Sequence, residues 1–139
     1  MKNLLRTLLL GLTAAAATIA YAAGPKETAQ IFFESLINGD ASKAAAVTYL
    51  PPEAEQQGIT EQVMRGKLGV ISMELREEIK KEGGSITVVS GEPTYTNAAK
   101  TEAKVPVTLK MRDKSGKTEE DKETLDLIKT DKGWKIQLH

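Results

Sequence analysis

The sequence contains no cysteine and a single histidine, which is the last of its 139 residues. Without cysteine the chain has no disulfide and no thiol to which a lipid could be attached, so a bacterial lipoprotein is excluded. Without an internal histidine, a nucleophile cannot be paired with a histidine base. His139 is expected to be exposed, because chain ends are commonly poorly ordered. The sequence therefore predicts no catalytic residue and no cofactor.

The sequence also lacks a net charge and a long apolar run. Its 19 basic residues balance 19 acidic residues, whereas nucleic-acid-binding proteins usually show a basic excess or stripe. The mostly apolar run Leu8–Ile19 has 12 residues, and a helix needs about 20 to cross a bilayer. We therefore expect neither nucleic-acid binding nor a membrane anchor.

The N-terminal residues have the three parts of a secretory signal peptide. Lys2 and Arg6 precede the apolar run, and Ala20-Tyr21-Ala22 supplies small residues at the third and first positions before a cut. We predict a signal peptide over 1–22, cleaved between Ala22 and Ala23, and a periplasmic or secreted mature chain.

The mature chain, residues 23–139, is expected to form one domain. Its 117 residues can bury enough surface to be stable without disulfides. Removal of Lys2 and Arg6 with the signal peptide leaves 17 basic and 19 acidic residues, so the mature chain has a net charge of about −2.

The spacing of apolar residues predicts three helices in the first part of this domain. The first opens at Pro25 and ends at Asn38-Gly39, and Asp40 can cap a second helix from Ala41 to about Tyr49. Residues 53–59 are polar and predict a connecting loop. Thr60 can cap a third helix over Glu61–Glu82. Its buried face is predicted from apolar residues at steps of three and four: Met64, Leu68, Ile71, Leu75 and Ile79.

The second part changes to the alternating period of β-strands. Strands are predicted at Ser85–Ser90, with extended residues at 93–96, then over 103–112, over about 122–129 and over 134–138. Short turns between them indicate hairpins. Pro106 removes a hydrogen-bond donor from what should be an inner strand, so a bulge or a sharp bend is expected there.

Segregated helices and hairpins predict an α+β fold, with three N-terminal helices packed on one face of a curved four-stranded antiparallel sheet. This layout resembles the nuclear transport factor 2-like (NTF2-like, or cystatin-like) fold, in which helices close a cone-shaped sheet. The resemblance rests on Phe32-Phe33, on Asn38-Gly39-Asp40, and on three C-terminal segments, residues 103–107, 125–129 and 131–136. Within that fold the chain is similar to the domain of unknown function 4878 family of small exported bacterial proteins. The family usually carries a lipoprotein signal, whose cysteine is missing here.

The resemblance implies a cone that could hold a ligand, and seven residues are candidates to line a pocket. They share an apolar or aromatic character at core spacing, with tyrosine hydroxyls as the polar members: Phe32, Phe33, Tyr49, Met64, Tyr95, Met111 and Trp134. Plain core packing is the commoner role of such residues, and both interpretations stay open.

Two clusters of charge have ordinary explanations. Glu119, Glu120, Asp121 and Glu123 lack the spacing and the glycine of a calcium loop, so no metal site is predicted. Lys104, Lys110, Arg112 and Lys135 are expected on the outward side of the sheet, mixed with Glu102 and Asp126. A mixed polar surface argues against a large apolar dimer interface, so we expect a monomer or a weak dimer.

Two functional hypotheses follow. The first is a non-enzymatic module of the cell envelope that binds a small apolar ligand or a partner protein. The second, implied by enzymes of the same fold, is a small isomerase- or hydrolase-like enzyme that uses a carboxylate or a tyrosine inside the cone. The second requires an inward Asp or Glu beside Tyr49 or Tyr95, and the strand pattern supplies none.

Overall fold

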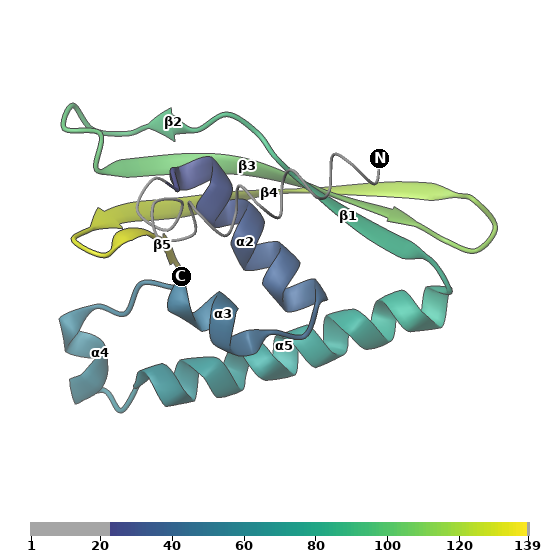
Figure 1. The fold of residues 1–139 in the computed structure, drawn as a ribbon, viewed down its shortest axis with the longest axis horizontal. Coiled ribbons are helices and arrows are strands. Elements are labelled where there is room, and N and C mark those ends of the chain that lie inside the picture. The colour runs from purple at the N-terminus through teal and green to yellow at the C-terminus, as the bar shows by residue number, and fades with distance from the viewer. Residues whose placement is uncertain (1–22, 139) are drawn as a thin grey trace, which may run out of the picture.

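The computed structural model describes residues 23–138. The predicted signal peptide, its cleavage site after Ala22 and His139 lie outside this range. The described residues form four helices and five strands (Figure 1), which follow one another as α2 (Pro25–Ile37), α3 (Ala41–Ala46), α4 (Pro52–Gln56), α5 (Glu61–Glu82), β1 (Ser85–Ser90), β2 (Thr94–Tyr95), β3 (Glu102–Arg112), β4 (Thr118–Thr130) and β5 (Gly133–Gln137). None of these helices is long and apolar enough to cross a membrane.

The strands form one antiparallel sheet in the order β1-β3-β4-β5, and the short β2 pairs with the other half of β3. The sheet is strongly curled. Tyr95 on β2 and Trp134 on β5 belong to strands separated by β3 and β4, yet their rings lie 6.1 Å apart. The predicted α+β fold with a curved antiparallel sheet is confirmed.

The helices form two layers on one side of the sheet. Helix α2 crosses the sheet and contacts β1, β3 and β5, whereas α5 packs mainly on α2 and α3. Figure 1 shows α5 running along the outside of this arrangement. The core between the layers is aliphatic with one aromatic residue: Ala29, Phe32, Leu36, Ala44, Ala45, Leu68, Val88, Val105, Val107, Leu127 and Ile136.

Helix α5 has the predicted bounds and cap. The Thr60 side chain accepts a hydrogen bond from the backbone N–H of Val63, and Gly83 closes the helix in the left-handed conformation with φ of 66°. Its buried face is the predicted one at Met64, Leu68, Leu75 and Ile79, which are buried or half-buried, and differs at one position. Ile71 is 48% exposed, whereas Ser72 is buried and donates a 2.5 Å hydrogen bond to the carbonyl of Leu36 in α2. A serine can face a neighbouring helix because it bonds a carbonyl in the last turn of that helix.

Two local predictions were wrong in the segment between α3 and α5. Asp40 caps α3 as expected, by accepting a bond from the N–H of Lys43, but α3 ends at Ala46 rather than near Tyr49. Residues 47–49 run beside β5 instead. The predicted loop begins with the short helix α4, which starts at Pro52, a residue suited to a first helical position.

The conflict posed by Pro106 is resolved by a break in the neighbouring strand, whereas β3 itself pairs with β4 through Pro106 without the expected bulge. Residues 91–93 separate β1 from β2 opposite Pro106, and the Gly91 N–H donates a 2.7 Å bond to the Pro106 carbonyl. A Cβ atom on Gly91 would lie 2.8 Å from the proline ring, so glycine permits this close approach.

At the start of α2, Lys26 forms an ion pair with Glu92, which lies between β1 and β2, at 2.8 Å. That hydrogen bond raises the pKa of Lys26.

Strand β4 begins at Thr118, four residues before its predicted start, because the turn to β3 is closed by Asp113. One Asp113 carboxylate oxygen accepts bonds from the N–H and Oγ of Ser115 and from the N–H of Lys117. The Ser115 bond lowers the pKa of Asp113. The carboxylate therefore stabilises the turn at neutral pH, and this contribution is lost as the pH falls through the lowered pKa.

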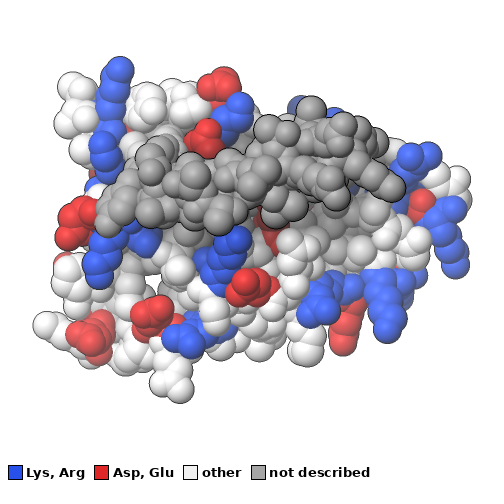
Figure 2. Space-filling model, viewed as in Figure 1, with Lys and Arg blue, Asp and Glu red and all other residues white. Residues whose placement is uncertain are grey.

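The side of the sheet away from the helices carries charges of both signs, as expected. Lys104 pairs with Asp126 at 2.7 Å and Lys110 with Glu120 at 3.8 Å. Figure 2 shows basic and acidic side chains interspersed over the face it presents. Exposed pairs of this kind contribute little to stability.

Two backbone groups at the outer edge of β1 are bonded by a side chain. The Gln30 amide of α2 donates to the carbonyl of Val88 at 2.7 Å and accepts from the N–H of Ser90 at 3.0 Å. It also accepts from the Ser90 hydroxyl at 2.8 Å. One amide thus makes the contacts of a neighbouring strand and fastens α2 to the sheet.

Substitution Gln30→Ala is expected to lower the free energy of unfolding by about 1 to 2 kcal/mol, because it leaves part-buried backbone groups without partners. Gln62→Ala, at an exposed position of α5 without a side-chain hydrogen bond in the described residues, should change it by less than about 0.5 kcal/mol. Urea unfolding followed by circular dichroism measures both. Equal effects would contradict the role given to Gln30.

The outward position of Ile71 on α5 is tested by two truncations on one helix. Leu68→Ala should cost about 2 to 5 kcal/mol because Leu68 is 1% exposed, and Ile71→Ala should cost less than about 0.5 kcal/mol. The same unfolding measurement decides. A large loss of stability in Ile71→Ala would show that Ile71 is buried in the core and would contradict its exposed position.

Candidate functional site

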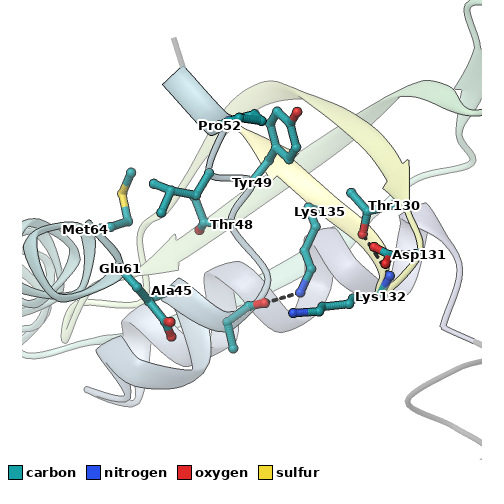
Figure 3. A pocket seen from close by; sticks show the side chains of 12 residues that line it. Ala45, Thr48, Tyr49, Pro52, Glu61, Met64, Thr130, Asp131, Lys132 and Lys135 are labelled. Carbon is teal, nitrogen blue, oxygen red and sulfur yellow. Dashed lines mark hydrogen bonds between the residues drawn. The ribbon is translucent and has the colours of Figure 1, made fainter. Parts of the chain in front are cut away.

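A cavity of about 630 Å³ lies between the helical segment 45–64 and the turn from β4 to β5. One wall is formed by Tyr49, Leu50, Pro52 and Met64, which are apolar or aromatic. Figure 3 shows the side chains of Tyr49, Pro52 and Met64 on the side opposite the turn residues. The remaining wall carries charged and polar groups of the turn and of β5.

The apolar wall is placed by the pairing of residues 47–49 with β5. The Ile136 N–H donates to the carbonyl of Val47, and the Tyr49 N–H donates to the carbonyl of Ile136, each at 2.7 Å. Thr48 forms the parallel bridge to Ile136, and its hydroxyl donates to the carbonyl of Ala44 at 2.8 Å. This pairing ends α3 early and carries the chain across the open end of the sheet.

The polar wall is held by the tight turn between β4 and β5. The Thr130 hydroxyl donates to the carbonyl of Gly133 at 2.8 Å and accepts from the Lys132 N–H at 3.1 Å. Lys135, on β5, donates from Nζ to the carbonyl of Ala46 at the end of α3. A cation at that position also interacts favourably with the helix dipole. Lys132 remains exposed at the rim.

Two carboxylates complete the lining. Glu61 begins α5 and Asp131 lies in the β4–β5 turn, and both line the cavity that Tyr49 lines. Both residues are exposed, so neither has the burial that tunes a catalytic carboxylate. Within residues 23–138 no group of three acidic or histidine side chains is placed to hold a metal ion.

The structure brings two of the seven candidate lining residues, Tyr49 and Met64, to this cavity. Phe32 is buried in the core and contacts Phe33 edge-on, with ring centroids 5.5 Å apart. Tyr95 and Trp134 pack on each other across the curled sheet. Met111 lies at the far end of β3, beside a small cavity that Glu119 also lines.

Sequence reasoning missed most of the lining. Leu50, Pro52 and Lys132 fall in turns or beside prolines, where no periodic pattern marks an inward face. Lys135 was expected on the outward side of the sheet, and its ammonium group instead bonds the end of α3 and lines the cavity. The prolines 51 and 52 were the one local signal that the chain turns here.

Comparison with solved structures identifies the fold as NTF2-like. A crystal structure from Campylobacter jejuni, described as a "putative NTF2-like transpeptidase", matches with a TM-score of 0.62 and 19% sequence identity, covering 84% of this chain and 100% of that chain. A SEC-C motif containing protein from Rhodopseudomonas palustris matches with a TM-score of 0.48 and 16% identity, covering 88% and 82%. No protein-family model and no curated protein matches the chain.

The contact across the curled sheet gives a spectroscopic prediction. Trp134 is the only tryptophan, and Tyr95→Ala should expose its ring, shift its emission to longer wavelength and cost about 1 kcal/mol of stability. Val89→Ala, at an exposed position of β1, is the control and should leave the emission unchanged. An unchanged spectrum in Tyr95→Ala would contradict the close approach of β2 and β5.

Proposed function

We propose that the chain is an exported, non-enzymatic binding domain of the NTF2-like fold, and that the cavity beside residues 47–52 holds a small ligand with an apolar body. The arrangement of charge and apolar surface in that cavity carries the proposal. An apolar wall faces a few polar groups in a space of about 630 Å³, which lies within the usual range of small-molecule sites.

Export is supported by the sequence of residues 1–22, with its basic start, short apolar run and small residues before the cut. The resemblance to the domain of unknown function 4878 family supports the same compartment. Because the chain has no cysteine, the mature domain would be released rather than tethered by a lipid.

The charges of the lining narrow the class of ligand. Lys132 and Lys135 stand near the turn, and Glu61 and Asp131 supply opposite charge at the same cavity. A ligand with an apolar body and a polar or zwitterionic end complements such a lining, because its apolar part displaces water from Tyr49, Leu50 and Met64.

A second candidate function, a small cone-fold enzyme, is favoured by one observation. Glu61 and Asp131 line the same cavity as Tyr49, which is the pairing of carboxylate and tyrosine that such an enzyme requires. Their exposure ranks this candidate second. Glu61→Gln and Asp131→Asn separate the two functions, because an enzyme that uses either carboxylate would lose the turnover seen in the wild type, whereas a binding domain turns over no ligand in the wild type or in the variants.

The test is native mass spectrometry of the full-length precursor after export to a bacterial periplasm. We expect the chain to start at Ala23 and to carry a reproducible added mass. Met64→Trp and Leu50→Trp fill the cavity and should abolish the added mass, whereas Val70→Trp, on the exposed face of the same helix, should keep it. Two tryptophan variants are used because Met64 also packs against the core.

A wild-type protein without added mass would overturn the proposal that the cavity binds a ligand. An added mass retained in both cavity-filling variants would show that the ligand binds at another site. A chain that keeps residues 1–22 would overturn export independently of either result.

A further inference from the structure

The edges of the sheet differ in how many of their backbone groups have hydrogen-bond partners. The Gln30 amide bonds the Val88 carbonyl and the Ser90 N–H at the edge of β1, and residues 47–49 pair with the edge of β5. Strand β5 pairs with β4 only from Asp126 onward, so residues 118–125 of β4 have a partner on one side alone within the described chain. Every residue from 118 to 124 is exposed.

The register shows which backbone groups this edge presents. The Lys129 N–H bonds the Thr101 carbonyl, and the Asp113 N–H bonds the Lys117 carbonyl, so odd-numbered residues of β4 bond toward β3. The even-numbered residues 118, 120, 122 and 124 therefore direct their N–H and C=O groups away from the sheet. The unpaired N–H and C=O groups of these four residues can form the backbone hydrogen bonds of one more strand.

The side chains beside this edge are acidic on one face. Glu119, Asp121 and Glu123 alternate on the side of the sheet that carries Met111, Leu109 and Val107, with which they are aligned in register. Among the described residues none of the three carboxylates forms an ion pair. On the other face Glu120 is already paired with Lys110.

A second copy of the chain is a poor occupant of this edge. Because the outward backbone groups belong to even-numbered residues, an antiparallel copy must align even with even and odd with odd positions. In the centred register Glu119 would face Glu123 and Asp121 would face its own counterpart, which makes three like-charge pairs against two pairs of Glu120 with Lys122 on the other face. Like charges directly opposite each other in a sheet are destabilising.

We propose that the open edge of β4 binds an extended cationic segment of another protein as an added strand. Lysine or arginine at every second position of that segment faces Glu119, Asp121 and Glu123, and its backbone bonds residues 118, 120, 122 and 124. The half-buried side chains of Leu109 and Met111 lie beside those carboxylates and accept the aliphatic stems of the basic residues.

The experiment titrates the purified chain with a capped synthetic heptapeptide of alternating lysine and valine, at low salt, and follows the backbone amides by NMR. We expect shift changes and slowed hydrogen exchange at Glu120 and Lys122. The same peptide with glutamate in place of lysine should not bind, and added salt should weaken the lysine peptide.

Two variants at one position separate the backbone from the side chain. Lys122→Pro removes an outward N–H without breaking a bond to β3, and proline is tolerated at such an edge position. The variant should bind the peptide about tenfold more weakly or worse. Lys122→Ala keeps the N–H and should bind at least as tightly as the wild type. The triple variant Glu119→Gln, Asp121→Asn, Glu123→Gln removes the charge at nearly constant size and should also weaken binding.

Three outcomes would overturn the proposal: no binding of the lysine peptide, shift changes centred away from residues 118–125, or equal affinity of the Lys122→Pro and Lys122→Ala variants in their folded state. A dimer in sedimentation velocity that Lys122→Pro dissociates would also overturn it, since the occupant would then be a second copy.

Discussion

An edge of a β-sheet presents unpaired N–H and C=O groups, and the way each edge is satisfied organises this molecule. Residues 47–49 pair with β5, and the same pairing ends α3, turns the chain toward α4 and builds the apolar wall of the cavity. At β1 the Gln30 amide bonds the Val88 carbonyl and the Ser90 N–H and so holds α2 against the sheet. The cavity and the docking of α2 are therefore consequences of how a curled sheet is closed.

The curl itself follows from the interruption at Pro106. A proline in an inner strand cannot donate to its neighbour, and the adjacent chain breaks into β1 and β2 around Gly91. The break lets the two halves of that edge follow different directions, which brings β2 toward β5 and Tyr95 toward Trp134. A bent sheet has a concave side that one helix can cross, and α2 takes that place, which leaves α5 to form a second layer.

Much of this fold could be predicted from the sequence because its signals are local. Thr60 and Gly83 delimit α5, Asp40 caps α3, and the alternation from Ala103 to Met111 marks β3. The errors come from contacts between residues far apart in the chain. Ser72 is inward because of a carbonyl in α2, α3 stops at Ala46 because residues 47–49 are paired by β5, and the cavity depends on that pairing. Of its lining, only Tyr49 and Met64 were predicted from the sequence, through their apolar or aromatic character.

The central claim is that the sheet edges differ, paired by residues 47–49 at β5, bonded in part by Gln30 at β1 and open at β4 over residues 118–124, and amide hydrogen exchange of the unliganded protein measures this directly. The N–H groups of Tyr49, Ile136 and Ser90 should exchange as slowly as those inside the sheet, and those of Glu120 and Lys122 should exchange nearly as fast as an unstructured chain. Fast exchange at Tyr49 and Ile136 would contradict the pairing that builds the cavity, and slow exchange at Glu120 and Lys122 would show that the edge of β4 is already covered.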